Sequence, residues 1–211
     1  MNNVQPSEGR KRSAYLPLIL LALALGAAAL LWFTRPGSAP EGNLSNAAIG
    51  QQFDLVDEEN RPVSNASFDG KWRLMYFGYT YCPDICPTDT ATMAAALDIL
   101  RQTNTQAAQR LQPLFVTVDP ERDTPEALAE YTDHFDPDLI GLTGSRAQID
   151  AALKTFRVYA RKMPGDTQDS YLYDHQAMFY LMDPRGRPVQ FLAGQGSTPE
   201  GLAATVEHFL G

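Results

Sequence analysis

The chain has 211 residues, of which 44% are hydrophobic and 20% are charged, and its formal net charge is −8 at pH 7. These values are ordinary for a globular protein and allow one well-buried domain with a short appendage. The acidic excess excludes a nucleic-acid-binding surface.

The beginning of the chain has the features of a membrane anchor. Residues 15–33 (YLPLILLALALGAAALLWF) form a run of nineteen residues without a charge. As a helix, this run would extend about 28 Å at about 1.5 Å per residue, which just spans a bilayer. Three basic residues at 10–12 precede it and only Arg35 follows closely. The positive-inside rule therefore predicts that residues 1–14 are cytoplasmic and that the rest is exported.

A cleaved signal peptide is the alternative interpretation, because the alanines at 27–29 suit a cleavage site. The apolar run continues to Phe33, which favours an uncleaved anchor. The first 35 residues hold four of the 17 basic and one of the 25 acidic residues, so the remainder has 13 basic against 24 acidic residues. The exported part therefore carries a formal charge of −11.

Residues 34–50 (TRPGSAPEGNLSNAAIG) are rich in Pro, Gly, Ser and Asn and show no apolar period, which predicts a flexible linker. The folded domain is predicted to comprise residues 51–211. Internal repeats are not evident in the sequence.

The first part of this domain alternates between apolar runs of strand length and segments with helical spacing. Thr124 and Ser145 stand where helix N-caps are expected, and Pro125 suits a first helical position. In order, we predict a hairpin within 53–64, a central strand at 72–78, a helix at 90–100, a strand at 114–118, a helix at 124–135, a strand at 139–144 and a helix at 145–156.

The pattern changes after Phe156. A polar loop is predicted through residues 163–170, followed by strands at 177–182 and 189–193 that flank a turn signal, DPRG. A helix at 198–210 ends the chain. The predicted fold class is α/β, a thioredoxin-like fold with a central mixed sheet flanked by helices, with one N-terminal transmembrane helix.

Cys82 and Cys86, the two cysteines of the chain, lie where the central strand leads into the first long helix. The free N–H groups and the positive dipole end of a helix stabilise thiolates, which attack disulfides and bind metals. Pro83 and Pro87 are expected to stiffen a loop there, since proline does not continue a helix interior. A structural disulfide remains an alternative, although so short a loop gains little stability from closure.

His175 is the third candidate, 89 positions after Cys86 and at the entry to the predicted strand at 177–182. In a thioredoxin-like arrangement, the loop before that strand faces the N-terminus of the first helix. Two thiolates and one imidazole suit copper, especially Cu(I), whereas structural zinc usually has four protein ligands. Asp174 is a candidate for orienting a ligand.

Other polar residues are assigned ordinary roles. His134 and His208 lie in polar helical contexts and are expected at the surface, whereas Met93, Met178 and Met182 are expected in the core. Residues 119–123 (DPERD) follow a parallel strand, where α/β proteins place their sites. They are expected either to line the mouth of the metal site or to form a solvated loop and helix cap.

The elements YTYCPDICPTD, VDPERDTP and YLYDHQAMFYLMDPRG, behind a single N-terminal anchor, resemble the Sco/SenC family of copper proteins over residues 51–211. The resemblance implies a thioredoxin-like domain in the periplasm or mitochondrial intermembrane space. It also implies one copper, Cu(I) or Cu(II), bound by Cys82, Cys86 and His175. The implied role is assembly of the CuA centre of cytochrome c oxidase subunit II, or of another copper-oxidase subunit. A separate copper chaperone is the implied donor, and the N-terminal helix is the implied contact with the membrane.

Two functions stay open at this point. A metallochaperone would hold copper and pass it on by ligand exchange. A thiol:disulfide oxidoreductase would use Cys82 and Cys86 as a redox pair to keep oxidase-subunit cysteines reduced. The histidine favours the chaperone, because disulfide exchange requires only the two cysteines.

Overall fold

The computed structural model describes residues 18–21, 23, 25–26, 49–50, 52–165, 167 and 170–210. The chain divides after Glu41 into two units. In the first unit, the described residues are helical and their leucines are 58–65% exposed. None of the described helices combines the length and the apolar content that crossing a membrane requires. Most of the predicted anchor and linker, and all of residues 1–14, lie outside the described residues.

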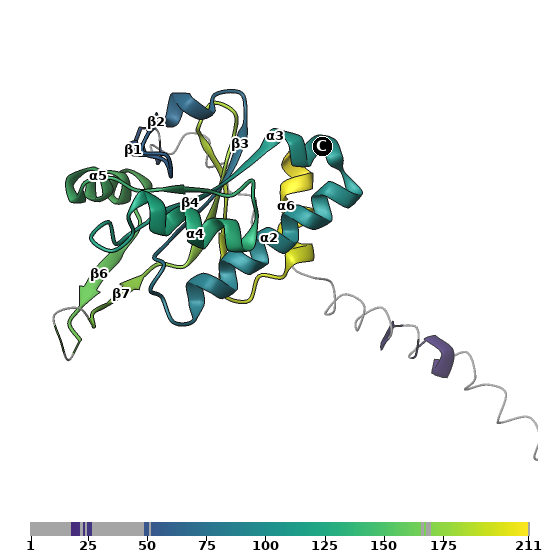
Figure 1. The fold of residues 1–211 in the computed structure, drawn as a ribbon. Helices are drawn as coiled ribbons and strands as arrows, with labels where there is room; N and C mark the ends of the chain where they lie inside the picture. The colour runs from purple at the N-terminus through teal and green to yellow at the C-terminus, as the bar shows by residue number, and fades with distance from the viewer. Residues whose placement is uncertain are drawn as a thin grey trace, which may run out of the picture. The chain divides into compact units, whose positions relative to one another are not determined.

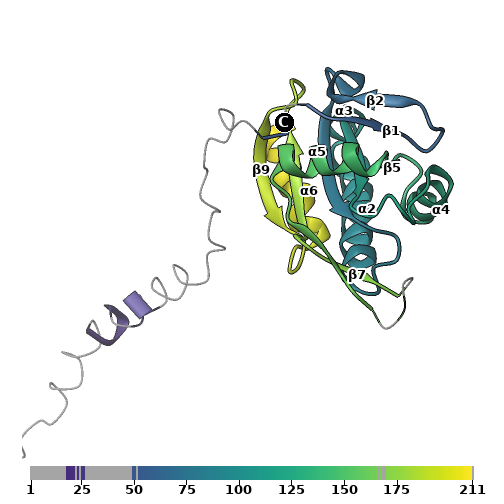
Figure 2. The ribbon, with the colours of Figure 1, turned by 90° about the vertical axis from the view of Figure 1, so that its left-hand side faces the viewer.

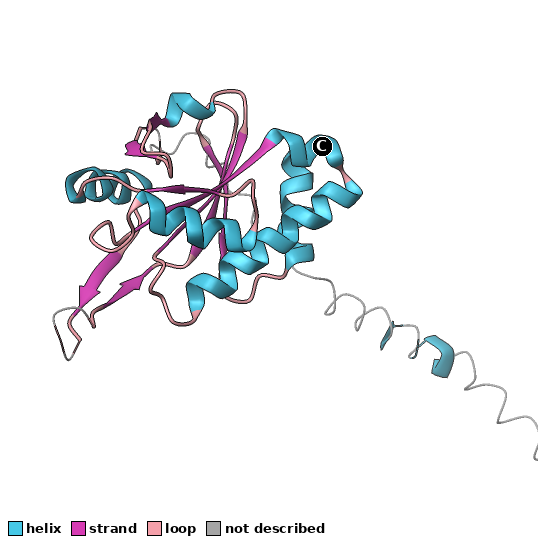
Figure 3. Cartoon of the chain, in the orientation of Figure 1, coloured by secondary structure: helices cyan, strands magenta, loops and turns pink. Residues whose placement is uncertain are grey.

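A five-stranded mixed sheet forms the centre of the second unit (Figures 1 and 3). Its order is β5-β4-β3-β8-β9; β3 is parallel to β4 and β4 to β5, while β8 is antiparallel to β3 and β9. The strands are β3 (Trp72–Gly78), β4 (Leu111–Thr117), β5 (Ile140–Leu142), β8 (Met178–Met182) and β9 (Pro188–Ala193). This topology confirms the predicted thioredoxin-like fold with its late hairpin.

The sheet is covered on both faces. α2 (Ile85–Thr103) packs against α4 (Pro125–Phe135) and α6 (Pro199–Leu210). Because side chains alternate along a strand, neighbouring residues of β3 face opposite layers. Phe77 meets Phe156 of α5 (Arg146–Phe156), with ring centroids 5.1 Å apart, whereas Gly78 lies against Cys86 of α2.

The helix caps follow the sequence signals. The Thr124 hydroxyl accepts a hydrogen bond from the Ala127 N–H at 3.2 Å, and Pro125 opens α4. Ser145 forms a capping box with Gln148 at the start of α5. Both caps satisfy N–H groups that a helix start leaves free, which confirms the predicted helix starts.

Two helices differ from the prediction. α2 begins at Ile85 and so contains Cys86 and Pro87, whereas the prediction began at residue 90. Proline is accepted there because N–H groups of the first turn have no intrahelical partner. The short helix α3 (Thr105–Arg110), whose N-cap Asn104 accepts from the Ala107 N–H, was not predicted.

Two strands that were not predicted border the polar loop expected at 163–170. They are β6 (Ala160–Met163) and β7 (Leu172–His175), which form an antiparallel hairpin that projects from the body of the domain in Figures 1 and 2. Of the described residues in the predicted loop, only Met163 belongs to a strand. His175 is the last residue of β7, paired with Ala160, and only Gln176 and Ala177 separate it from β8, so its predicted place at the entry to that strand is confirmed. The predicted N-terminal hairpin is confirmed as β1 (Asp54–Val56) and β2 (Pro62–Ser64), followed by the 3-10 helix η3 (Asn65–Phe68).

Candidate metal centre

The fold brings Cys82, Cys86 and His175 together. Their ligand atoms all lie within 4.8 Å of one another, and the Cys86 Sγ is 3.2 Å from the His175 Nε2. Three segments meet here: the loop after β3, the first turn of α2 and the end of β7. The sequence prediction that His175 reaches the cysteine pair is therefore confirmed as geometry.

The loop between β3 and α2 determines the positions of the two sulfur atoms. The Cys82 N–H donates to the Tyr79 carbonyl at 3.2 Å, which closes a tight turn. The Cys86 N–H donates to the Cys82 Sγ at 3.4 Å. Cys86 is the second residue of α2, so the helix N-terminus offers its free N–H groups and its positive dipole end to the Cys82 sulfur.

The two cysteines differ in exposure and in protonation. Both are free thiols; Cys82 is partly exposed and Cys86 is 0% exposed. A hydrogen bond from the Cys86 thiol lowers the pKa of Cys82, and His175 and nearby backbone N–H groups act in the same direction against the opposing effect of burial. The same contact, together with burial, raises the pKa of Cys86. The pair therefore combines an accessible thiolate with a buried thiol.

Gly78 makes room for the inner sulfur. A Cβ atom at this position would lie 2.9 Å from the Cys86 Sγ and 3.1 Å from a ring carbon of Phe115. Both separations are shorter than ordinary van der Waals contact. Glycine at the end of β3 thus lets α2 bring Cys86 against the sheet.

His175 lies between two aromatic rings. The rings of Tyr76 and Tyr79 meet it edge to face, with centroids 6.4 Å and 5.7 Å away. Within the described part of the chain, its buried Nδ1 has no hydrogen-bond partner. Asp174, the expected orienting group, is exposed, and its carboxylate accepts a hydrogen bond from the Tyr159 hydroxyl at 3.4 Å.

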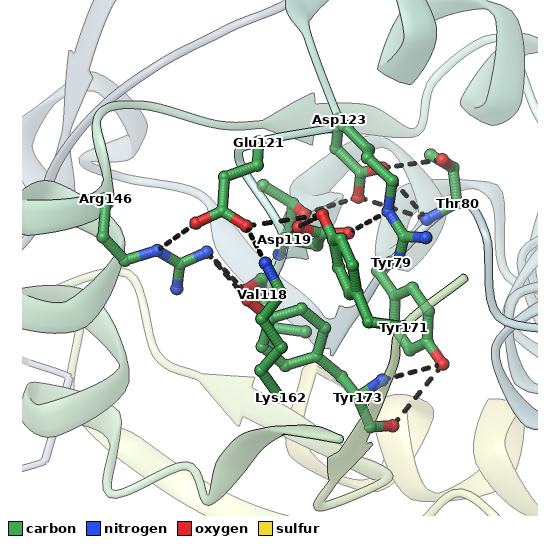
Figure 4. A network of polar contacts seen from close by, with 12 residues as sticks. Tyr79, Thr80, Val118, Asp119, Glu121, Asp123, Arg146, Lys162, Tyr171 and Tyr173 are labelled. Atoms are coloured by element: carbon green, nitrogen blue, oxygen red, sulfur yellow. Dashed lines mark hydrogen bonds and ion pairs between the residues drawn. The ribbon is translucent and has the colours of Figure 1, made fainter. Parts of the chain in front are cut away.

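Tyr79 fixes the strand that carries His175. Its hydroxyl accepts from the Tyr173 N–H at 3.2 Å and donates to the Tyr173 carbonyl at 3.5 Å. Tyr173 lies two residues before His175 in β7, so a side chain of the cysteine loop holds the backbone beside the histidine (Figure 4).

The DPERD loop also contacts this hairpin (Figure 4). The Tyr171 hydroxyl donates to the Asp119 carboxylate at 3.0 Å, and the Lys162 ammonium group lies 2.8 Å from Glu121. Arg146 of α5 donates to the Tyr173 hydroxyl at 3.2 Å. These contacts make the loop a support for β6 and β7.

Asp123 ties the DPERD loop to the cysteine loop. Its buried carboxylate accepts from the Thr80 hydroxyl at 2.6 Å and from the Thr117 hydroxyl at 2.5 Å. Burial raises the pKa of Asp123. Asp119 is also 0% exposed, so the solvated-loop interpretation of this segment is wrong for both aspartates.

The donor set fits a soft metal ion. Ligand atoms that surround a metal at about 2.0–2.3 Å in a trigonal plane lie about 3.5–4 Å from one another. The three donors here already fall near this spacing. Sulfur and imidazole ligands select Cu(I) over hard cations, so the cluster is a candidate copper site.

The other histidines and the methionines considered in the sequence do not belong to the cluster of Cys82, Cys86 and His175. His134 and His208 are exposed, and Met93 and Met182 are buried, as predicted, whereas Met178 is only partly buried. His134 borders an open cavity of about 650 Å³ beside the cysteine loop, which Tyr81, Pro87 and Phe135 also line. Tyr76, Tyr79 and Asp89 surround the cysteines and were not anticipated, because only tertiary contacts bring them to the site.

Comparison with known proteins agrees with this geometry. The SCO1/SenC family model matches residues 41–211. Protein sco1 of Schizosaccharomyces pombe is 42% identical over 160 residues, which cover 75% of this chain and 59% of that protein. The chain thus spans about three fifths of that relative's length.

Two solved structures show the same fold. Copper-bound ScoI of Bradyrhizobium japonicum is 40% identical, with a TM-score of 0.70 and coverage of 77% of this chain and 100% of that one. BsSco, described as a member of the Sco family of cytochrome c oxidase assembly proteins, is 27% identical, with a TM-score of 0.63 and coverage of 79% and 96%.

Proposed function

The chain belongs to the SCO1/SenC family, and from this premise we propose that it is a copper metallochaperone that binds one copper ion through Cys82, Cys86 and His175. The observation that carries the proposal is the 3.2 Å approach of the His175 Nε2 to the Cys86 Sγ, within a cluster of three soft donors. Copper bound to the relative from Bradyrhizobium japonicum supports the choice of metal.

The unequal exposure of the ligands suits transfer. Cys82 is partly exposed and favours the thiolate, so it is the ligand that a donor or acceptor protein reaches. Cys86 is buried and holds the ion from the inside. Exchange of one ligand at a time through Cys82 lets the cargo pass without being released to solvent.

The cargo is proposed to serve the CuA centre of cytochrome c oxidase. Subunit II or another copper-oxidase subunit is the proposed acceptor, and a separate copper chaperone is the proposed donor. The description of BsSco as belonging to a family of oxidase assembly proteins supports this role.

The domain 51–211 is proposed to lie outside the cytoplasm. The linker 34–50 is proposed to connect it to a single-pass anchor at 15–33 in the inner membrane. The charge asymmetry around the apolar run supports this orientation, with residues 1–14 in the cytoplasm. In a mitochondrion, the same topology places the domain in the intermembrane space. A reporter fused after Gly211 tests it: activity of a reporter that works only in the cytoplasm would reverse the topology.

Reduction of oxidase-subunit cysteines is the second candidate function. The pairing of an accessible thiolate at Cys82 with a buried thiol at Cys86 favours it, since a thiolate attacks a disulfide and a neighbouring thiol resolves the mixed disulfide. This chemistry does not require His175 as a ligand, although the imidazole contributes to the lowered pKa of Cys82.

A His175→Ala strain separates the two functions. If the protein delivers copper, this strain loses oxidase activity at low copper and recovers at least part of it when copper is supplied in excess. If the protein is a reductase, the strain keeps its oxidase, and only Cys82→Ala and Cys86→Ala strains fail until a reductant is added. Normal oxidase assembly by His175→Ala under copper limitation would contradict the chaperone.

A further inference from the structure

A tyrosine side chain lies directly behind the inner cysteine. Tyr76 is on β3 and is 0% exposed. It shares a face of the strand with Gly78, and a Cβ at Gly78 would be 2.9 Å from both the Tyr76 Cε1 and the Cys86 Sγ. The ring edge of Tyr76 therefore lies next to the sulfur, on the side away from solvent.

The Tyr76 hydroxyl lies between two polar groups. It interacts with the Cys86 sulfur and with the carboxyl group of Asp89, which is one turn further along α2 and 2% exposed. Neither the Tyr76 Oη nor the Asp89 Oδ2 makes a hydrogen bond of full geometry to a described residue. Both buried polar atoms are therefore available for a hydrogen bond close to Cys86, a candidate metal ligand.

Gly194 shows that space is kept for this carboxyl group. A Cβ atom at Gly194 would overlap the Asp89 carboxylate, so the chain after β9 approaches Asp89 through a residue without a side chain. Burying a carboxyl and a phenol without strong hydrogen bonds costs free energy, and an apolar pair of the same shape would avoid that cost. A role for the pair beyond packing would explain its presence.

The direction of the contacts follows from which groups carry a hydrogen. The phenol O–H of Tyr76 is a hydrogen-bond donor at neutral pH, whereas a thiolate sulfur carries no proton and can only accept. The Tyr76 hydroxyl can therefore donate to the Cys86 sulfur once that sulfur is a thiolate, and the Asp89 carboxyl group contacts the same hydroxyl.

We propose that Tyr76, oriented by Asp89, donates a hydrogen bond to the Cys86 sulfur when that sulfur is a metal-bound thiolate, and so sets the preference of the site between Cu(I) and Cu(II). Both residues are positioning residues, because neither is a ligand. The inference rests on the proposed copper site and adds to it the group that adjusts its electronic character.

The sign of the effect follows from the chemistry of sulfur ligands. A hydrogen bond withdraws electron density from a thiolate, which weakens its donation to Cu(II) more than to Cu(I), and hydrogen bonding around such a sulfur is an established determinant of redox potential. Loss of the hydroxyl should therefore shift the relative affinity toward Cu(II). We expect a change of about tenfold, which for a one-electron couple corresponds to about 59 mV.

The test is the Tyr76→Phe variant of the full chain in detergent, titrated with copper alone. Its Cu(II)/Cu(I) midpoint potential should fall by the stated amount, and its thiolate-to-Cu(II) charge-transfer band should move to lower energy. Tyr180→Phe is the matched control, since Tyr180 is buried in β8 but packs against Phe156 and Phe191 rather than the cysteines. It should leave both values unchanged.

A second variant keeps the volume of the ring and reverses the sign. A 3-fluorotyrosine at position 76 is a more acidic and stronger donor, so it should raise the potential and move the band to higher energy. This variant also decides the question if Tyr76→Phe does not fold. One copper per chain in all proteins, with equal potentials and bands, would overturn the inference and leave the proposed function intact. A wild-type protein that binds no copper would overturn the proposed function itself.

Discussion

The contact between Tyr79 and β7 leads to a quantitative prediction. Replacing Tyr79 by phenylalanine removes one hydroxyl and keeps the ring that meets His175 edge to face. The hydroxyl makes two hydrogen bonds to the Tyr173 backbone, one of 3.2 Å and one of 3.5 Å, the second at the limit of hydrogen-bond distance. The Tyr173 N–H and carbonyl would lose this partner in a buried position.

We expect Tyr79→Phe to lower the free energy of unfolding by about 1–2 kcal/mol, because a hydrogen bond contributes about 1 kcal/mol net and a buried unsatisfied group costs about 1–3 kcal/mol. A loss of 1.4 kcal/mol that acts only on the docking of the hairpin makes its opening about tenfold more frequent. The other anchors of the hairpin, Tyr171 to Asp119 and Lys162 to Glu121, remain. Copper affinity should therefore fall by at most about the same factor.

Urea unfolding and hydrogen exchange measure these effects. The amides of β6 and β7 should exchange faster in Tyr79→Phe, while those of β3 and β4 keep their protection apart from the global loss. Tyr81→Phe is the control, because Tyr81 is 60% exposed and the same atom is removed two residues along the chain. Equal unfolding free energies and equal hairpin exchange in Tyr79→Phe and wild type would refute the assigned role of the hydroxyl.

Three further outcomes are expected. Gly78→Ala should lower the free energy of unfolding, measured with urea, by about 1–3 kcal/mol and weaken copper binding, because its Cβ would displace the Cys86 sulfur. Unchanged copper affinity would contradict the close approach of Gly78 to this sulfur. Burial tends to raise the pKa of Asp136, but the Arg101 guanidinium, bonded at 2.6 Å and 2.8 Å, and a backbone N–H lower it overall. The ionised form of Asp136 therefore stabilises the fold above about pH 4. Asp136→Asn should lower the free energy of unfolding, measured with urea, by about 2 kcal/mol at pH 7 and by progressively less as the pH falls below about 4. An equal loss at pH 3 would contradict this. His134→Ala should leave copper stoichiometry and affinity unchanged in a metal titration, since this histidine is exposed on α4; a loss of copper would assign it to the site.

The parts of the fold with strong local signals were predictable from the sequence. The strand at 72–78 is apolar apart from Arg73 and is buried throughout, and Thr124 and Ser145 cap their helices through contacts within three residues. The two sulfur atoms of the candidate metal site were also predictable, because the chain has two cysteines, one in the loop that leads into α2 and one in the first turn of that helix. Few other residue types offer soft donors.

The hairpin of β6 and β7 was not predictable in this way. Residues 161–163 are exposed and show no alternation of apolar and polar side chains, so the strand lacks a periodic signal. It is held by tertiary contacts, such as Lys162 with Glu121, that link positions 41 residues apart. The same reason hid Tyr79 and Asp89, because their roles depend on long-range neighbours rather than on local pattern.

The proposed function requires that one copper ion is held by two sulfur atoms and one imidazole nitrogen. X-ray absorption of the copper-loaded full chain in detergent tests it most directly. We expect one copper per chain with two sulfur ligands and one nitrogen ligand, and loss of the nitrogen ligand with weakened copper retention in His175→Ala. Full copper occupancy with an unchanged ligand set in His175→Ala would contradict the account.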